Sequence, residues 1–468
     1  MIDVPWIVRV ATIASCLVLS TTAGLEASEW YVAVDGKGTG TREAPFGRIQ
    51  DALAVAQPGD TIHVSPGTYE ESLRTVRGGS PDRPIVVRAS SARGSVLVTA
   101  SGRVLTVRHP YHIFEGLVLD GQYGMDDIVR AGDEADGLVL RDCEIRRTSR
   151  DGIDLGAPAD VLIENSIVHH ALNAANGRTD AHGIVAGGVR RLTIRNTEVH
   201  TFSGDAFQVD PDRESPGWDD ITIDGCRFWL RPLPAAANGF PAGVVPGENA
   251  VDTKAARSGH RPRIVIRNTT AYGFRKGLIP NMAAFNLKEE IDAVIDAVTV
   301  HSSEIGFRLR APAAVRIQNA VIHDVEYAVR YEDDIETVTV WNSTFGGGIG
   351  HHFFAAESPR TVLDVRNVAV LGDRLPSGIS DRSNLALGAD AFVNAAAHDY
   401  RLKPSSPAID RGIVLERVDR DRQGVKRPQG KAHDIGAYEH PAGDGNGRQP
   451  PVSFTEGWRS RHAARPAR

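Results

Sequence analysis

The sequence of 468 residues contains only three cysteines. Cys16 falls in the apolar segment near the N-terminus, which leaves Cys143 and Cys226 for the folded chain. The repeat described below places these two at the same position of different coils, so we expect stacked, buried thiols and no disulfide, although an exported protein can form one. A basic excess is also missing. The formal net charge of -6 argues against nucleic acid as the main partner.

No apolar run is long enough for the roughly 20 residues that cross a bilayer as a helix. The run VATIASCLVLS follows Arg9 and is followed by the small residues of TTAGLEAS. This pattern predicts a secretory signal peptide over residues 1–27, as opposed to a membrane anchor. We therefore expect a secreted or periplasmic protein with no membrane insertion after the signal is removed.

From about residue 85, the chain repeats a short pattern in which apolar residues alternate with polar ones on both sides of a small turn residue. Alternation with a period of two predicts short, half-buried strands. Gly and Asn tolerate the left-handed backbone of a sharp bend, which explains their frequency at the turn. The turn positions are Gly116, Asp142, Asn165, Asn196, Gly225, Asn268, Ala297, Asn319, Asn342 and Asn367.

The spacing of the turn residues runs from 22 (297 to 319) to 43 (225 to 268), with most values in the twenties. Coils of this length predict an all-β fold, a single-stranded right-handed parallel β-helix over residues 85–385. A β-propeller needs about 40 to 45 residues for each blade. We expect a capping helix and the first coils in 28–84, a closing segment in 386–440 and a disordered Gly-, Pro- and Arg-rich tail in 441–468.

Charged residues collect at the outward positions of one predicted strand column, if Ile153, Ile184, Phe207, Val251, Leu278, Phe307 and Val329 point inward. The earlier coils supply carboxylates, and the later ones supply cations. The carboxylates are Asp151, Asp154, Asp180, Asp205, Asp210, Glu248 and Asp252, and the cations are Lys254, Arg275, Lys276, Arg308, Arg310 and Arg330. Carboxylates stacked at the spacing of one coil repel each other unless a cation neutralises them, and oxygen ligands suit Ca²⁺.

This arrangement suits β-elimination from a uronate, in which the proton on C5 becomes acidic once the adjacent carboxylate is neutralised. A lysine whose pKa is lowered by nearby positive charge can take that proton. Lys254 is the candidate base because it lies between the acidic and basic halves. Arg275, 21 residues further on, is the candidate partner on the next coil.

A second column follows the turns by four residues and holds rings: His169, His200, Trp229, Tyr272, His301 and His323. We expect a structural stack there and no transition-metal site, because no carboxylate or thiolate spacing joins these residues. His182 differs because it stands in the Asp-rich column, where we assign it to substrate contacts.

Two further stretches resemble parts of secreted β-helix polysaccharide lyases: YVAVDGKGTGTREAPFGRIQDALAVAQPGDTIHVSPGTYEE at the start, and DAFVNAAAHDYRLKPSSPAIDRG with HDIGAYEH at the end. Over residues 29–440 the chain resembles family nine, the pectate lyases, and family six, the alginate and dermatan lyases. The resemblance to family nine implies Lys254 as the base and Asp180, Asp205 and Asp210 as Ca²⁺ ligands. The resemblance to family six implies a pairing of Lys254 with Arg275, and Glu248 and Asp252 near the metal.

The sequence therefore predicts a monomeric lyase of an acidic polysaccharide, with Arg308, Arg310, Lys276 and His182 contacting the substrate. Two alternatives stay open. A glycoside hydrolase would use two carboxylates such as Asp205 and Asp252, and a C5-epimerase would share the lysine base. A non-catalytic protein would use the same charges only to bind a glycan.

Overall fold

The computed structural model describes residues 27–174, 180–357 and 360–441. The predicted signal peptide and tail lie outside the described residues, apart from residue 27 and residue 441. No helix in the described part of the chain is long and apolar enough to cross a membrane.

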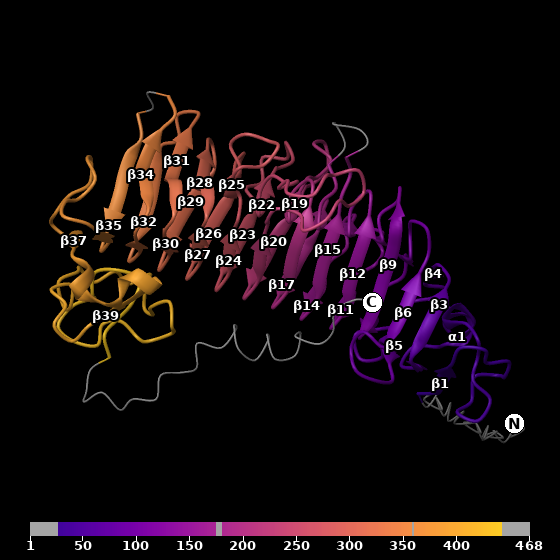
Figure 1. Cartoon of the computed structure of the whole chain (residues 1–468). Helices are drawn as coiled ribbons and strands as arrows, with labels where there is room; N and C mark the ends of the chain where they lie inside the picture. The colour runs from indigo at the N-terminus through magenta and orange to yellow at the C-terminus, as the bar shows by residue number, and fades with distance from the viewer. Residues whose placement is uncertain (1–26, 175–179, 358–359, 442–468) are drawn as a thin grey trace, which may run out of the picture.

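The chain forms a parallel β-solenoid of about 12 turns, built from three long sheets that run the length of the molecule (Figure 1). Sheet A has 13 strands, in spatial order β1 (Glu29–Val32), β2 (Thr61–Val64), β5 (Ile85–Ala89), β8 (His112–Glu115), β11 (Val139–Arg141), β14 (Leu162–Glu164), β17 (Arg190–Arg195), β20 (Asp219–Asp224), β23 (Arg263–Arg267), β26 (Asp292–Asp296), β29 (Ala314–Gln318), β32 (Thr337–Trp341) and β35 (Val362–Arg366).

Sheet B also has 13 strands, in spatial order β3 (Gly67–Glu70), β6 (Val96–Thr99), β9 (Leu117–Gly124), β12 (Glu144–Thr148), β15 (Ile167–Ala171), β18 (Glu198–Phe202), β21 (Arg227–Trp229), β24 (Thr270–Tyr272), β27 (Thr299–His301), β30 (Val321–Ile322), β33 (Thr344–Phe345), β36 (Ala369–Leu371) and β37 (Leu385–Leu387). Sheet C has 11, in spatial order β34 (Ile349–Ala355), β31 (Val325–Glu332), β28 (Ser303–Arg310), β25 (Ala283–Leu287), β22 (Val251–Thr253), β19 (Phe207–Val209), β16 (Ile184–Ala186), β13 (Ile153–Leu155), β10 (Val129–Ala131), β7 (Leu105–Val107) and β4 (Leu73–Arg74).

Each coil passes through sheets A, B and C in that order and pairs in parallel with the next coil, as β11, β12 and β13 do with β14, β15 and β16. The predicted turn column lies between sheets A and B. All ten predicted positions have a positive φ, between 42° and 77°. The sequence-based prediction of a parallel β-helix is confirmed.

The core is a continuous stack of apolar side chains inside the three sheets. Phe207, Val251, Phe285 and Phe307 occupy one inward column of sheet C, and all are fully buried. The prediction of Leu278 in this column is wrong, because Leu278 is 60% exposed and Phe285 pairs with Val251 instead. Pro280 interrupts the segment around Leu278, since proline lacks the N–H that a central strand donates.

Two features lie at the ends of the solenoid. The short helix α1 (Ile49–Val55) packs against β1, β2 and β4 and buries Ile49, Ala52 and Leu53. Its role as a cap for the end of the core stays a prediction. After the last coil come η1 (Ala389–Ala391), β38 (Phe392–Asn394), η2 (Ala395–Ala397) and β39 (Asp399–Leu402), and β38 pairs with β39 antiparallel.

The closing segment lies against the turn column of the last coils, which Figure 1 shows in yellow below the sheets. The side-chain amides of Asn319, Asn342 and Asn367 donate to the carbonyl oxygens of Arg420, Asp434 and Ile413, at 3.0, 3.3 and 2.8 Å. The asparagines therefore tie this segment to the coils in addition to making the bends.

Cys143 and Cys226 are free and buried, as expected. Each Sγ donates to a main-chain carbonyl of the preceding coil, that of Phe114 or that of Ile194, at 3.4 Å in both cases. Burial raises the pKa of Cys143 to about 11 and that of Cys226 to about 12.

Candidate active site

The outer face of sheet C brings together polar residues from many coils. One outward residue of each strand pairs with its counterpart on the next coil, in the order Arg130, Asp154, Val185, Gln208, Asp252, Asn286, Arg308 and Arg330. Neighbouring strands lie about 4.8 Å apart, so these side chains form a continuous surface. Acidic and amide groups occupy its middle, and arginines follow on the later coils.

Asp252 lies in the middle of this surface and is almost fully buried. Its Oδ1 accepts a hydrogen bond from Asn286 Nδ2 at 2.7 Å and lies 2.9 Å from Lys288 Nζ. Burial and the charge of Asp205 raise the pKa of Asp252 to about 6, although Lys288 acts in the opposite direction. The carboxylate is therefore short of positive charge even with the lysine beside it.

Asp205 lies one coil earlier, next to the same face, and is also buried. It accepts hydrogen bonds from the Asn249 main-chain N–H at 3.1 Å, Asn249 Nδ2 at 2.8 Å and Gln208 Nε2 at 2.9 Å. Burial nevertheless raises the pKa of Asp205 to about 6. The main-chain N–H of Asp205 donates to His182 Nδ1 at 2.8 Å, so the ring of His182 braces this part of the chain.

Glu248 is half-buried at the end of the long loop between β21 and β22. Burial, followed by the charges of Asp205, Asp180 and Asp252, raises the pKa of Glu248 to about 8. Asp180 itself is exposed, directly after residues 175–179. Carboxylates that raise one another's pKa in this way either retain protons near neutral pH or attract a cation.

One further atom of this group is unsatisfied. Asn286 is 5% exposed, and its Oδ1 has no hydrogen-bond partner among the described residues. A buried amide oxygen without a donor is costly, and a bound cation or donor removes that cost. Carboxylate and amide oxygens are the ligands that Ca²⁺ takes, so Asp205, Glu248, Asp252 and Asn286 offer suitable kinds of donor atom, although the oxygens of the three carboxylates do not all lie within 4.8 Å of one another.

Two lysines stand at the end of the strands beside these acids. Lys254 directly follows β22, and its Nζ donates to Asp210 Oδ2 at 2.7 Å. The buried indole of Trp218 donates to the Lys254 carbonyl at 2.7 Å, which fixes the backbone there. Lys288 occupies the equivalent place on the next coil, two residues past Asn286 as Lys254 is two residues past Asp252.

This register corrects the prediction that Arg275 stands one coil after Lys254. Arg275 lies in the loop after β24, and its Nη1 donates to Asp324 Oδ1 at 2.9 Å. Lys276 lies in the same loop, exposed and with a φ of 53°. The misplacement follows from the ten-residue connection between β24 and β25, because the prediction puts a strand around Leu278 where the structure has this loop. Asn286 and Lys288 are residues of this candidate site that the sequence analysis does not identify, although the matching spacing of AVDTK and AFNLK indicates them.

Arg308 and Arg310, which are predicted to contact the substrate, and the neighbouring Arg330 lie around Glu332 on the later coils. Arg308 places Nε 2.7 Å and Nη2 3.0 Å from the two oxygens of Glu332, and Arg330 Nε lies 3.1 Å from Glu332 Oε1. Arg310 lies at 3.1 Å from Asp333. Three guanidinium groups near two carboxylates leave this end of the face positively charged.

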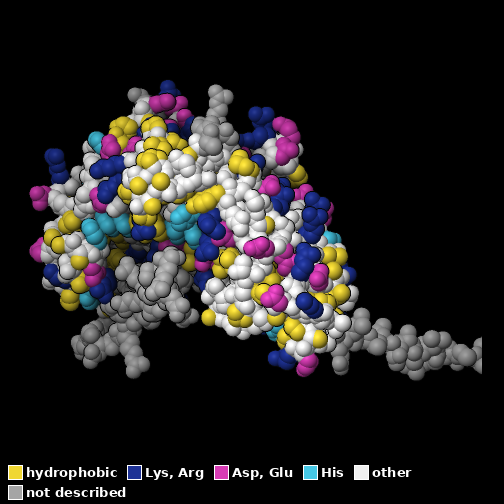
Figure 2. Space-filling model, turned by 45° about the vertical axis from the view of Figure 1, so that its right-hand side comes forward, with side chains coloured by type: hydrophobic (Ala, Val, Ile, Leu, Met, Phe, Trp, Pro, Cys, Tyr) yellow, Lys and Arg dark blue, Asp and Glu magenta, His cyan; other side chains and the backbone are white. Residues whose placement is uncertain are grey.

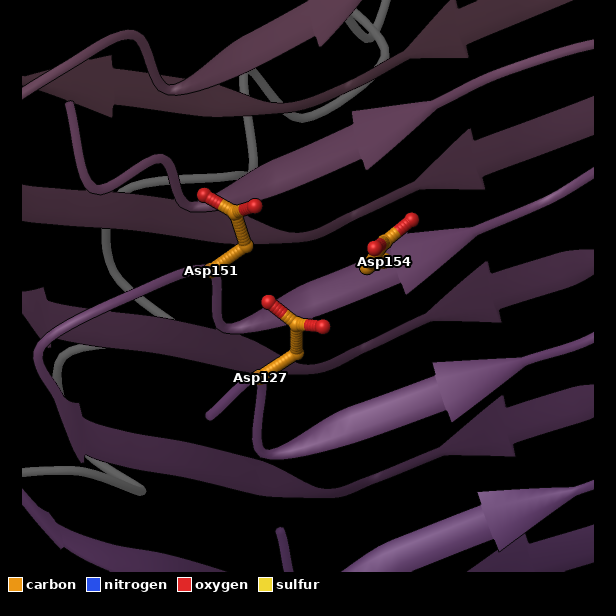
Figure 3. A group of neighbouring side chains, drawn as sticks. All are labelled: Asp127, Asp151 and Asp154. Atoms are coloured by element: carbon orange, nitrogen blue, oxygen red, sulfur yellow. The ribbon is translucent and has the colours of Figure 1, made fainter. Parts of the chain in front are cut away.

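Figure 3 shows a second acidic group on earlier coils, formed by Asp127, Asp151 and Asp154, whose carboxylate oxygens lie within 4.8 Å of one another. Its charge is compensated: Arg130 pairs with Asp154, and Arg103 and Arg150 lie 3.5 and 3.3 Å from Asp127. Asp151 accepts from the His182 main-chain N–H at 2.9 Å. Among the described residues, this is the group in which three such side chains come within 4.8 Å of one another, and arginines already neutralise two of its three carboxylates.

The predicted ring column lies on sheet B and forms a continuous stack, which confirms its position. His169, His200, Trp229, Tyr272, His301 and His323 stack in that order with centroid separations of 4.3 to 6.0 Å, and His398 continues the stack at 3.9 Å. Figure 2 shows histidines reaching the surface in separate groups, among interspersed acidic, basic and apolar side chains.

Comparison with protein families finds one match, to a family described as a protein of unknown function (DUF1565), over residues 32–76. No curated protein matches the chain. The fold is similar to that of a lacto-N-biosidase from Eubacterium ramulus, with a TM-score of 0.50, 11% identity, and coverage of 72% of this chain and 67% of that one.

Two lyases are also similar in structure. The pectate lyase Pel9A has a TM-score of 0.47 and 17% identity, with 89% of this chain and 98% of that one covered. A mannuronic acid specific family 6 lyase from human gut microbiota has a TM-score of 0.49 and 13% identity, with 78% and 84% covered. At such identities the likeness concerns the fold alone. The fold itself is the parallel β-helix that the sequence predicts.

Proposed function

We propose that the protein is an enzyme that cleaves a uronate-containing acidic polysaccharide by β-elimination, with the outer face of sheet C as its active site. The observation that carries this proposal is the gradient along one face: carboxylates with raised pKa around Asp252, two lysines at the strand ends, and arginines on the following coils. An anionic chain lying along this face would meet a cation site and a basic strip together.

The cation that we assign to the site is Ca²⁺, held by Asp205, Glu248 and Asp252 with Asn286 Oδ1, and with Asp180 and Asp210 at the edge. When bound there, it would neutralise the substrate carboxylate and so make the C5 proton acidic. His182 and Asn249 position Asp205 through the hydrogen bonds described above.

The chain's own residues then supply the base and the carboxylate contacts. We assign proton abstraction to Lys254, which directly follows β22 and whose amine lies 2.7 Å from Asp210 Oδ2. Lys288 takes the role first given to Arg275, because it stands on the next coil beside Asp252. Arg308 and Arg310 lie where the polymer would continue along the face. A secreted or periplasmic location would give the enzyme access to such polymers, which are extracellular.

The decisive experiment incubates the purified mature protein with polygalacturonate, alginate and dermatan sulfate, with Ca²⁺ or with a chelator, while the absorbance of the unsaturated product is followed. We expect a rise on one polymer that the chelator abolishes and that Lys254→Ala lowers by at least about a hundredfold, the scale of a lost general base. Lys431→Ala, an exposed lysine of the closing segment, is the matched control and keeps the wild-type rate. No rise on any polymer would contradict the lyase proposal.

One observation favours a second candidate, a glycoside hydrolase. A carboxyl whose pKa is about 8 stays protonated at neutral pH and can act as a general acid, as Glu248 would, with Asp252 or Asp205 as its ionised partner. A hydrolase would release reducing ends without ultraviolet absorbance and would tolerate the chelator. Binding of a polymer that yields neither new reducing ends nor absorbance would identify a glycan-binding protein. A change of stereochemistry at C5 without cleavage would identify an epimerase.

A further inference from the structure

An open pocket of about 600 Å³ lies beside the two lysines, formed by the loops that follow β19, β22, β25 and β28 on four consecutive coils. Ala255 and Glu289 line it and directly follow Lys254 and Lys288 in the sequence. The pocket therefore begins where the proposed catalytic face ends. Its volume is within the range of pockets that hold small ligands.

The wall of the pocket is fixed by an ion pair between Arg213 and Glu289. Arg213 Nη1 also donates to the Ala255 carbonyl at 2.5 Å, and Glu289 Oε2 accepts from the Ala255 main-chain N–H at 2.6 Å. Three loops from three coils are joined by these contacts. The charges of Arg213 and Glu289 compensate each other, so this wall is close to neutral.

Arg257 lies at the pocket and is held much more loosely. Its ion pair with Glu214 spans 3.4 Å, and the two side chains are 78% and 77% exposed, a kind of pair that contributes little stability. A guanidinium group recognises a carboxylate through two parallel hydrogen bonds. Beside it, Ala311 and Pro312 supply accessible apolar surface for the C–H face of a sugar ring.

We propose that this pocket is a subsite for a second uronate unit of the polysaccharide, whose carboxylate Arg257 binds after displacing Glu214. The inference rests on the proposed function, because it takes the ligand to be the same acidic polymer that lies along sheet C. In this subsite, Arg257 would recognise the carboxylate of a sugar unit other than the one that reacts. Longer oligouronates would gain affinity from the subsite, and the shortest would not reach it.

The test measures binding by calorimetry to the mature protein carrying Lys254→Ala, which is expected to slow turnover at least about a hundredfold. The probes are oligogalacturonates and oligomannuronates of three and six units. In the series that binds, we expect Arg257→Ala to weaken the hexamer at least fivefold and the trimer less than twofold. Glu214→Ala removes the competing carboxylate and is expected to tighten the hexamer. Arg263→Ala, an exposed arginine 3.9 Å from Asp220 and away from the pocket, is the control without effect.

The subsite is refuted if the hexamer binds the Arg257→Ala and Arg263→Ala proteins equally well and Glu214→Ala has no effect, or if neither series binds. These outcomes are separate from the fate of the lyase proposal. Polymer cleavage that needs Lys254 but ignores Arg257 would remove the subsite alone. Oligomer binding that needs Arg257, without cleavage of any polymer, would keep the subsite and remove the lyase.

Discussion

At the scale of single residues, Glu248 is the most informative group of the candidate site. Its pKa is raised from 4.5 to about 8, first by burial and then by Asp205, Asp180 and Asp252. A carboxyl whose pKa is raised in the folded state makes its full contribution to stability below pH 4.5, where it is protonated in both the folded and the unfolded chain. That contribution is lost as the pH rises through 8, because the unfolded chain releases the proton first.

Glu248→Gln therefore has a pH-dependent effect on stability. Since glutamine does not ionise, we expect the variant to exceed the wild type at pH 9 by at least about 1 kcal/mol, and to match it within error near pH 4.5. Urea unfolding in the presence of chelator measures the difference at the two pH values. Added Ca²⁺ should remove the advantage by stabilising the wild type. An equal difference at both pH values would show that ionisation of Glu248 is not the cause.

The sequence predicted many residues of the site but not all their positions. Asp205, Asp252 and Lys254 lie in short segments whose alternation is visible without a structure, so their place on the face followed directly. Arg275 was misplaced and Lys288 missed because the length of each connecting loop decides which residues share a coil. Loop lengths vary here, and nothing in the local pattern reveals which part of a long connection returns to the sheet.

At the scale of elements, the turn between sheets A and B is the most regular feature. Seven of the predicted turn residues, Asp142 and six asparagines, are Asx residues that enter the left-handed region readily, and two are glycines. Ala297 is the exception, with a φ of 54° and a side chain that is 8% exposed. This column could be predicted in full, because the bend imposes its own residue preference at each coil.

Ala297→Asn should stabilise the protein. The left-handed backbone conformation costs an L-residue about 1–2 kcal/mol. Asparagine offsets part of this cost through local hydrogen bonds of its side chain, whereas alanine has no such group. We expect a gain of about 0.5–1 kcal/mol by denaturant unfolding. The reciprocal change Asn342→Ala should cost more, since it also removes the bond to the Asp434 carbonyl. A loss of stability in Ala297→Asn would mean that neighbouring side chains leave no room for the amide.

At the scale of the whole molecule, the ring stack on sheet B links six coils and the closing segment. Burial, followed by His398 and His301, lowers the pKa of His323 to about 3, and burial lowers the pKa of His200 and of His301 as well. A histidine with a lowered folded-state pKa contributes stability above pH 6.5. That contribution is lost as the pH falls from 6.5 towards the folded-state value, because the unfolded chain binds protons first.

His323→Phe should thus reduce the sensitivity of the protein to acid. Phenylalanine keeps the stack, and the His323 Nδ1 that it removes has no hydrogen-bond partner among the described residues. We expect the fall in Tm between pH 7.5 and pH 4.5 to be several degrees smaller in the variant than in the wild type. His260→Phe, which replaces a histidine with a side chain 53% exposed, serves as the comparison and should behave as the wild type. Equal falls in all three proteins would exclude the stack as the origin.

The architecture of the whole molecule was predictable because every coil repeats the same signal, so errors in one coil do not change the fold. The pocket beside Lys254 and Lys288 was not. It needs loops from four coils, and the contacts of Arg213 with Ala255 and Glu289 join residues up to 76 positions apart. Such a site depends on the path that each loop takes away from the sheet. The alternation of apolar and polar residues in the strands does not determine that path.

The two buried cysteine thiols offer a way to observe local opening of the solenoid. Cys143 and Cys226 occupy the same place on coils three apart, both sealed in the core with a raised pKa. In the folded protein neither thiol is a target for alkylation, because the raised pKa leaves little of the reactive thiolate and the surrounding core excludes the reagent. Each becomes a target only when its own stretch of the solenoid separates from its neighbours. The rate at which each is labelled therefore reports the opening of one stretch independently of the other, without a foreign probe.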